Sequence, residues 1–314
     1  MNVSRRSFIG GVLATSAGCV CGKGAMPRHR SDYDGVQVGA ITYSFRTMKL
    51  VKDCTLQHTL DAKLGSIELM ASDLERDLGV PYGDQMFWRL SNEQKAEVIA
   101  WRKAVDPESY RAIAERYRAA GIRVHTVKFD QIGTAGMSDW ETDYSFRTAK
   151  VMGARAITRE VPDVKNFEAF RPQAARLAKY TSKYGINIAF HNHLQINATT
   201  YDGALLDMCP EFRINFDIGH YVAANDDCPL AFVKKYHDRI SSIHLKDRTR
   251  KAHGQKNLAF GQGDTPLKDL FALLVKEGWD IPCDIELEYP IPEGSDAVRE
   301  VGACNAFCRN AIIA

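Results

Sequence analysis

Short, nearly continuous apolar runs alternate with longer amphipathic stretches along most of the chain after residue 31. Short apolar runs bounded by turn residues are typical of strands buried on both faces, whereas the longer stretches have the spacing of helices. The predicted strands cover residues 36–44, 66–70, 122–128, 154–159, 186–190, 213–216, 240–245 and 283–287. The predicted helices cover residues 56–63, 93–103, 107–120, 139–152, 167–184, 201–208, 229–236, 267–277 and 295–312.

This alternation predicts a parallel sheet, because each helix returns the chain to the same end of the next strand. Eight strand–helix units favour a closed (β/α)8 TIM barrel, one α/β domain over residues 32–314, rather than an open sheet. The glycine-rich fingerprint of dinucleotide folds does not follow the first strand. Gly153, Gly185 and Gly278 stand where helices are expected to end. Residues 73–92 are predicted to be an irregular polar segment.

Residues 1–31 are predicted to be an export signal and linker. The stretch SRRSFI at residues 4–9 is a twin-arginine pattern, and a small apolar run follows it. The twin-arginine machinery exports folded proteins, so this partner implies a periplasmic or membrane-anchored protein that folds and takes up any metal before export. Two alternatives stay open: a flexible basic tail, and a lipoprotein cleavage site that would leave a lipid anchor at Cys19.

Composition narrows the function classes. The 314 residues are 45% hydrophobic and 25% charged, as in ordinary globular proteins. A net charge of +2 without a long basic run gives nucleic-acid binding no electrostatic support. The cysteines form no Cys-x-x-Cys pair, so neither a thiolate metal site nor a disulfide is predicted. The turn at residues 261–264 could hold an anion, but a plain loop before a helix is the favoured interpretation.

Side chains that can bind a metal stand at the ends of four consecutive predicted strands. In a barrel, the carboxyl ends of the strands meet at one mouth, so these side chains should converge. Each has a structural alternative: a single histidine at a strand end is usually structural, and Asp217 could only cap the next turn. A shared site is favoured because such side chains stand at the ends of four consecutive strands. Its candidates are His191, His193, Asp217, His244, Glu286 and Glu288.

This mixture of imidazole and carboxylate suits a divalent cation such as Mn²⁺, Mg²⁺, Co²⁺, Fe²⁺ or Zn²⁺. Glu286 and Glu288 would share one face of their strand, and two carboxylates inside a barrel are costly without a cation. The sequence therefore predicts a divalent-metal site at the mouth of the barrel.

The chain resembles the sugar phosphate isomerase/epimerase group of xylose isomerase-like TIM barrels, especially its twin-arginine-exported branch. The likeness covers nearly the whole chain after the signal and is most specific in the second half. The stretches that carry it are ITYSFR (41–46), FHNH (190–193), FDIGHYVAA (216–224), IHLKDR (243–248), FGQGDTP (260–266) and IELEY (285–289).

The resemblance implies a metal held by Glu, Asp, His and Glu at the ends of strands five to eight. Asp217, His244 and Glu286 match the last three, and the offset from Gly278 favours Glu286 over Glu288. At strand five the sequence departs from the pattern, because His191 stands where the Glu would be. That Glu is one of two acid/base groups in the epimerases, so a two-glutamate mechanism is in doubt here.

The chemistry that this site implies is proton removal next to a carbonyl, with the metal stabilising negative charge on the substrate oxygens. The candidate bases are His193, Glu286, Glu288 and Glu160, while Lys246 and His220 could polarise oxygens. The family's Asp-x-x-His motif implies that His220 contacts substrate, as Arg248 or Arg250 would. Weaker candidates are Glu68, His125 and Lys128.

Three functions follow from these observations. The first is an isomerase or epimerase acting on an unphosphorylated sugar or cyclitol, because phosphorylated sugars are scarce outside the cytoplasm. The second is a lyase or hydratase-type enzyme on 3-keto-glycosides or inosose-like substrates, which export and His191 favour. The third is a sugar-binding barrel without turnover, against which the full set of metal ligands argues.

Overall fold

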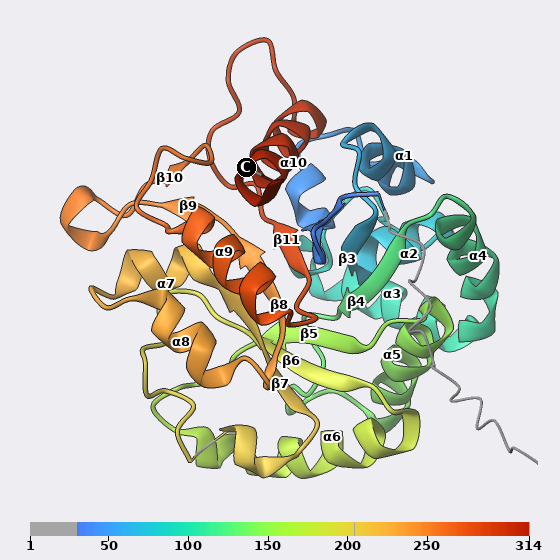
Figure 1. The fold of residues 1–314 in the computed structure, drawn as a ribbon. Coiled ribbons are helices and arrows are strands. Elements are labelled where there is room, and N and C mark those ends of the chain that lie inside the picture. Colours follow the sequence, from blue (N-terminus) through green and yellow to red (C-terminus); the bar gives the residue numbers. More distant parts are fainter. Residues whose placement is uncertain (1–29, 204, 314) are drawn as a thin grey trace, which may run out of the picture.

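The computed structural model describes residues 30–203 and 205–313, and its centre is a barrel of eight parallel strands (Figure 1). The barrel order is β2, β11, β8, β7, β6, β5, β4 and β3, and pairing between β2 and β3 closes the ring. The predicted closed (β/α)8 barrel is confirmed. Its strands are β2 (Val36–Ile41), β3 (Ser66–Met70), β4 (Arg123–Lys128), β5 (Ala156–Glu160), β6 (Asn187–His191), β7 (Phe212–Asp217), β8 (Ile240–Leu245) and β11 (Cys283–Ile285).

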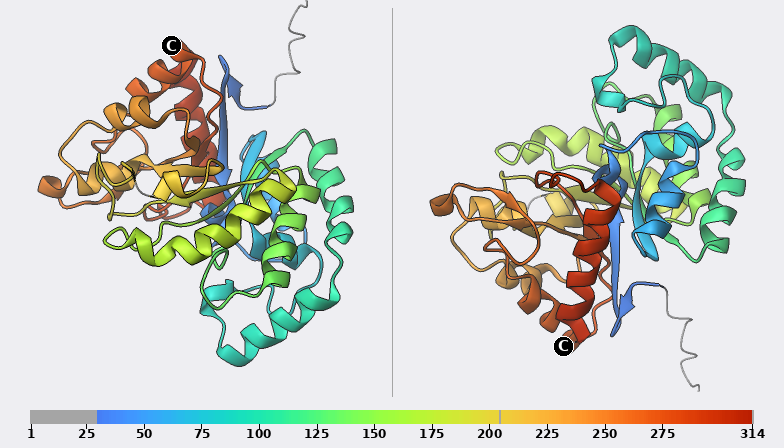
Figure 2. Two further views of the ribbon diagram at one scale, coloured as in Figure 1. Left: turned by 90° about the horizontal axis from the view of Figure 1, so that it is seen from below. Right: turned by 90° about the horizontal axis from the view of Figure 1, so that it is seen from above.

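Helices surround the strands on the outside of the barrel, and α10 lies alongside β2, so that the last helix covers the first barrel strand (Figure 2). Gly153 and Gly185 end their helices in the left-handed conformation, as the sequence predicted, and Gly278 does the same. The helices are α1 (Cys54–Asp61), α2 (Ala71–Asp77), α3 (Asn92–Ala104), α4 (Arg111–Ala119), α5 (Asp139–Met152), α6 (Arg171–Tyr184), α7 (Ile218–Ala224), α8 (Pro229–Tyr236), α9 (Leu267–Glu277) and α10 (Ala297–Ile313).

Two of the predicted elements were wrong. The polar segment expected at residues 73–92 begins inside helix α2, which the apolar pattern could not reveal because its buried face carries charges. Asp73 pairs there with Arg76, and Glu75 pairs with Arg102 of α3 at 2.7 Å. The helix expected at residues 201–208 is only a short 3-10 turn, Leu205–Met208, in the part that the structure describes.

The first described residues already belong to the fold. Ser31, which we expected in the linker, is buried, and its hydroxyl donates to the carbonyl of Val38. The short strand β1 (Asp32–Tyr33) then pairs antiparallel with β2. The predicted twin-arginine segment and Cys19 lie outside the described residues. Within residues 30–203 and 205–313, no helix combines the length and apolar character that crossing a bilayer requires.

The glycine turn before α9 is held by the chain itself. The backbone N–H groups of Gly261, Gln262 and Gly263 all donate to Oδ2 of Asp247, at 2.7, 3.1 and 3.0 Å. Asp247 belongs to the short strand β9 (Asp247–Arg248), which pairs with β10 (Asn257–Leu258) directly after β8. A carboxylate of the protein therefore fills the position that an external anion would take, in agreement with the plain-loop interpretation.

Candidate active site

Four of the predicted ligands converge at the carboxyl end of the barrel. His191 ends β6, Asp217 ends β7, His244 lies in β8 and Glu286 follows β11. One donor atom from each lies within 4.8 Å of the other three, and none of the four residues is more than 7% exposed. We call these residues the four-ligand cluster. Parallel register places two of them at one level, because Asp217 and His244 are partners across β7 and β8.

His191 is a neutral imidazole in this environment. Burial and the nearby charge of Lys128 lower its pKa well below the usual value for histidine. Its Nδ1 lies 2.7 Å from Oδ1 of Asn215 on the neighbouring strand β7. The other ring nitrogen, Nε2, is therefore the one available to the cluster.

His244 has the opposite electrostatic environment. Its Nε2 lies 2.9 Å from Oε2 of Glu68, and its Nδ1 lies 3.0 Å from Oε2 of Glu286. Burial disfavours the charged ring, but the two carboxylates outweigh burial and raise the pKa of His244 well above its ordinary value. Without a metal, the ring is therefore an imidazolium between two carboxylates.

Asp217 uses only one of its carboxylate oxygens to stabilise the fold. Oδ1 accepts the backbone N–H of His220 at 2.6 Å and thereby caps helix α7, which the sequence had not predicted as a helix. Oδ2 is buried and makes no hydrogen bond, although Nζ of Lys246 lies 3.0 Å away. The capping role and the ligand role are thus compatible, because a separate oxygen is available for each.

Lys246 lies at the edge of the cluster rather than free in the cavity. Its ammonium is 2.9 Å from Glu288, 3.1 Å from Glu286 and 3.0 Å from Asp217. Burial opposes the charge of Lys246, but these carboxylates raise its pKa, so the ammonium stays protonated. Lys246 therefore contacts both carboxylates of the four-ligand cluster, Asp217 and Glu286, and also Glu288.

The donor set fits a divalent cation. Two imidazoles and two carboxylates from four adjacent strands are the ligand types that Mn²⁺, Co²⁺, Fe²⁺ or Zn²⁺ accepts. The buried Oδ2 of Asp217 makes no hydrogen bond and faces the ammonium of Lys246 at 3.0 Å, so this oxygen lies in a position that already favours positive charge. Glu286, not Glu288, belongs to the cluster, as the offset from Gly278 suggested.

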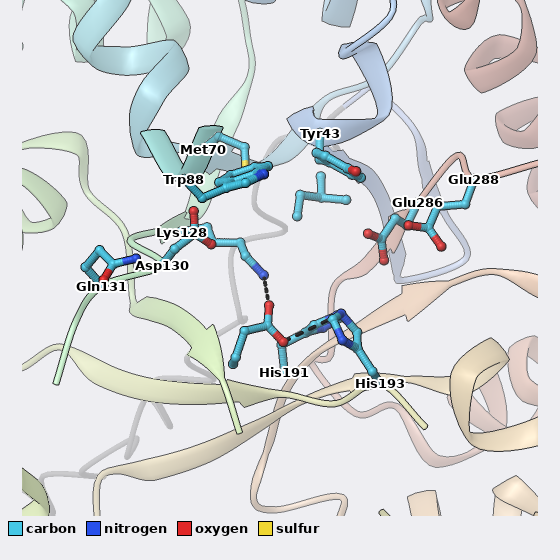
Figure 3. A pocket seen from close by; sticks show the side chains of 12 residues that line it. Tyr43, Met70, Trp88, Lys128, Asp130, Gln131, His191, His193, Glu286 and Glu288 are labelled. Atoms are coloured by element: carbon cyan, nitrogen blue, oxygen red, sulfur yellow. Dashed lines mark hydrogen bonds and ion pairs between the residues drawn. The ribbon is translucent and has the colours of Figure 1, made fainter. Parts of the chain in front are cut away.

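A cavity of about 410 Å³ opens above the cluster (Figure 3). Lys128 lies on one side of it, Glu286 and Glu288 on another, and Tyr43 and Trp88 form an aromatic wall (Figure 3). Its lining residues are Ile41, Tyr43, Met70, Trp88, Lys128, Asp130, Gln131, Glu160, His191, His193, Glu286 and Glu288.

Glu160 and His193 border the cavity together. Oε1 of Glu160 accepts from Nζ of Lys128 at 2.8 Å, and its other oxygen lies 3.6 Å from Nε2 of His193. Burial disfavours the charge of Lys128, but the carboxylates led by Glu160 outweigh burial and raise the pKa of the lysine. Glu160 is thus a carboxylate that is held in place by a permanent cation and half-exposed to the cavity.

Not every candidate reaches the cavity. His220 contacts Nζ of Lys246 at 2.9 Å and Nη1 of Arg248 at 2.6 Å, and burial among cations lowers its pKa to about 2. Arg250 points elsewhere and donates to the carbonyl of Asn225. Glu68, expected to contact substrate, is fully buried below the cluster and does not line the cavity.

The remaining weak candidate, His125, is also internal, because it bonds to Asp284 at 3.0 Å inside the barrel. Sequence reasoning missed Asn215, Tyr43, Trp88 and Asp130. A signal existed for two of them: Asn215 interrupts the apolar run of β7, and Tyr43 follows the first barrel strand. Nothing in the sequence pattern distinguishes Trp88 from other loop aromatics.

The barrel and its mouth define the class of the protein: a (β/α)8 enzyme-type fold with a histidine–carboxylate cluster where such barrels place their chemistry. The chain belongs to the xylose isomerase-like TIM barrel family, whose model matches residues 76–304. Metal dependence is common in this family.

Known proteins similar to this chain include both dehydratases and epimerases. An inosose dehydratase from Bacillus anthracis (strain CDC 684 / NRRL 3495) is 30% identical over 125 residues, which cover 33% of this chain and 42% of that protein. One from Clostridium tetani (strain Massachusetts / E88) is 27% identical over 126 residues, covering 33% of this chain and 42% of that protein. The match therefore spans less than half the length of these curated relatives.

Solved structures share the fold at low sequence identity. The probable 3-DHS dehydratase AsbF from Bacillus anthracis has a TM-score of 0.62 at 11% identity and covers 86% of this chain and 98% of its own. A D-psicose 3-epimerase has a TM-score of 0.61 at 12% identity, covering 89% and 100%. The 3-keto-D-glucoside 4-epimerase YcjR from E. coli has a TM-score of 0.58 at 11% identity, covering 88% and 99%.

Proposed function

We propose that this protein is a divalent-metal-dependent isomerase or epimerase of an unphosphorylated keto sugar or cyclitol, acting outside the cytoplasm by proton transfer next to the carbonyl. The observation that carries the proposal is the placement of acid/base groups on two sides of one cavity. Glu160 and His193 border it at the ends of β5 and β6, while Glu286 and Glu288 border it after β11. Removing a proton from one face of a carbon and returning one to the other requires such a pair.

Each group has a role that follows from its contacts. Asp217, His244, Glu286 and His191 would hold the metal, which when bound supplies the positive charge that stabilises developing negative charge on the substrate oxygens. Glu160, which accepts a hydrogen bond from Lys128, would accept the proton from carbon. Glu288 would return a proton, taken up from solvent, on the opposite side, and Lys246, which does not line the cavity, would hold the Glu288 side chain in place.

The charges of the cavity support an unphosphorylated substrate. Among the described residues that line it, the only lysine or arginine is Lys128, and Glu160 already neutralises it. The other charged residues of the lining, Asp130, Glu286 and Glu288, are acidic, so the described lining offers a phosphate group no free side-chain cation. The aromatic wall of Tyr43 and Trp88 suits the apolar face of a sugar ring instead. The twin-arginine pattern supports an extracytoplasmic location.

Elimination is the second candidate, and one observation favours it. His191 stands where the resemblance implies a glutamate, so the β6 end holds no carboxylate to return a proton. If the abstracted proton is not returned to carbon, the electron pair can form a double bond and break the bond to a β-oxygen, which takes up a proton and leaves as water or an alcohol. The sequence match to inosose dehydratases points the same way. A 3-keto-glycoside or an inosose would then be the substrate class.

Solvent exchange distinguishes the two candidates. The protein, loaded in turn with Mn²⁺, Co²⁺ and Zn²⁺, is incubated in deuterated water with free sugars, inososes and 3-keto-glycosides, and products are followed by NMR. Deuterium incorporation with a new stereocentre or carbonyl position supports isomerisation or epimerisation, whereas release of water or an aglycone supports elimination. If no carbonyl substrate incorporates deuterium or releases water or an aglycone, the proton-transfer proposal is overturned.

A further inference from the structure

We propose that Glu68 is a positioning residue that sets opposite tautomers in the two histidines of the cluster, so that His191 presents Nε2 and His244 presents Nδ1 to the cation. This inference rests on the metal site of the proposed function. It assigns a role to a buried carboxylate that the proposed reaction does not use directly. The argument depends on one oxygen atom, Oε2 of Glu68, which receives hydrogen bonds from two different strands.

The first branch runs through Asn215. Its side-chain amide has two ends, and Nδ2 lies 2.9 Å from Oε2 of Glu68 and 2.8 Å from Oγ of Ser242. An ionised carboxylate only accepts hydrogen bonds, so the NH₂ end must face Glu68 and the oxygen end must face His191. Oδ1 only accepts as well, and it lies 2.7 Å from Nδ1 of His191. The proton of the neutral His191 ring is therefore on Nδ1, which leaves the lone pair of Nε2 for a metal.

The second branch is direct. The same Oε2 lies 2.9 Å from Nε2 of His244, so this nitrogen must carry a proton. The other ring nitrogen, Nδ1, faces Glu286, a member of the cluster, at 3.0 Å. A cation can replace only the Nδ1 proton of His244. One carboxylate oxygen thus fixes Nε2 ligation in one histidine and Nδ1 ligation in the other.

Burial makes Glu68 a positioning residue rather than a catalytic one. Glu68, Asn215, Ser242 and His244 are fully buried in the barrel interior, and Glu68 does not line the cavity. The other oxygen of Glu68, Oε1, has no hydrogen-bond partner among the described residues. Glu68 therefore acts on the site only through Oε2. Carboxylates that orient ligating histidines in this way commonly change metal affinity by about 10- to 100-fold.

The test measures which ring nitrogens of His191 and His244 carry a proton or bind a metal. Two-bond ¹H–¹⁵N spectra of the ¹⁵N-labelled full chain, with and without Zn²⁺, distinguish protonated, free and metal-bound ring nitrogens. In the wild type we expect Nδ1–H on His191 in both states, and after loading we expect Zn²⁺ on Nε2 of His191 and Nδ1 of His244. Glu68→Gln can donate as well as accept, so mixed tautomers and a 10- to 100-fold weaker Zn²⁺ affinity should follow.

Two further variants keep the test decisive. Asn215→Ala cuts only the first branch, so His191 should lose its fixed tautomer while His244 keeps Nδ1 ligation. Glu75→Gln changes another buried carboxylate, which pairs with Arg102 and contacts neither histidine of the cluster, so both cluster tautomers should remain as in the wild type. Unchanged tautomers and unchanged Zn²⁺ affinity in Glu68→Gln would overturn the inference. The inference would also be overturned if Nδ1 of His191 carried no proton in the wild type.

The outcomes separate this inference from the proposed function. Fixed tautomers and Zn²⁺ binding without solvent exchange on any substrate would refute the reaction and leave the positioning role intact. The metal-free spectra report the His191 tautomer even when no ion binds. Exchange activity with the same tautomers in the wild type and Glu68→Gln would support the reaction and refute the positioning role.

Discussion

Glu160 of β5 and His191 of β6 are register partners in the parallel barrel, and the N–H that follows Glu160 bonds to the carbonyl of His191 at 2.8 Å. The carboxylate that the family resemblance implies at the β6 end is thus replaced by one on the adjacent strand, at the same level of the barrel. This relationship separates metal binding from proton transfer: His191 can serve the first and Glu160 the second.

Glu160→Gln should therefore lose proton exchange and keep the metal. The amide can still accept from Lys128 but cannot take a proton from carbon, so we expect solvent exchange to fall by about 100-fold or more. Metal content by mass spectrometry should equal that of the wild type. Exchange at the wild-type rate would show that another group is the base.

His191→Glu should retain a bound divalent ion, because it restores the glutamate that the resemblance implies at this strand end. The new carboxylate would add an acid/base group at the cluster. We expect the ratio of epimerised to eliminated product to rise with any substrate that gives both. The ratio is measured by NMR in deuterated water, and an unchanged ratio would mean that this position does not decide the outcome.

Asp217→Asn should abolish stoichiometric metal binding without unfolding the chain. The amide oxygen can still cap α7 through the N–H of His220, but the negative charge that Oδ2 brings to the cluster is lost. We expect metal affinity to fall at least about 100-fold. Glu288→Gln is the matched control, because Glu288 contacts Lys246 but lies outside the four-ligand cluster. This control should keep its metal, and equal metal loss in both variants would contradict the assignment.

Metal affinity should fall as the pH falls. The carboxylates of Glu68 and Glu286 raise the pKa of His244 despite its burial, so below that raised pKa the incoming ion must displace a proton from the ring. His191, whose pKa burial lowers, contributes no such proton. Below the raised pKa of His244, the dissociation constant should rise about tenfold for each unit of acidification. Calorimetry in buffers of different ionisation enthalpy measures the released proton, and a pH-independent constant would contradict this reading.

Asp77 should make the fold less stable as the pH rises. Burial raises the pKa of Asp77 to about 6, so the folded chain binds a proton that the unfolded chain has released. Its stabilising protonation is complete below the ordinary pKa of 3.8 and is lost as the pH passes about 6. Asp77→Asn keeps the acceptor for the N–H of Asp53 and removes the penalty.

Near pH 8 the variant should therefore unfold at a higher temperature than the wild type, and its free energy of unfolding should be greater by at most about 3 kcal/mol. Near pH 4 the two proteins should unfold at similar temperatures. Calorimetric scans at the two pH values measure the difference. If the wild type instead gains stability relative to Asp77→Asn as the pH rises, Asp77 is ionised in the folded chain.

The convergence of the four candidate ligands could be predicted because each lies within or just after a run that the sequence pattern assigned to a buried strand. Asp217 after RINF and His244 within SSIHL are placed by strand position alone. Glu68 and Asn215 could not be placed in the same way, because their contact depends on which residues of β3 and β7 meet across the barrel interior. A strand pattern fixes the face of a side chain but not its partner on a non-adjacent strand.

Helix α2 and the aromatic wall were missed for a different reason. The buried face of α2 is charged, and its ion pairs with α3 replace the apolar stripe that reveals an amphipathic helix. Trp88 lies in a short 3-10 turn, where its position depends on packing against Tyr43 and not on any period in the sequence. Such features need the tertiary structure before they can be assigned.

The hydrogen bonds from the glycine turn to Asp247 affect how a substrate can enter. They tie the loop after β8 to the rim of the barrel, so that this side of the mouth behaves as a fixed wall and not as a cover. Trp88 stands on the opposite half of the rim, in a segment that is more exposed and carries only a short 3-10 turn, Phe87–Arg89. Because Trp88 lines the cavity and is itself exposed, a bulky substituent on a bound substrate would reach solvent past this ring.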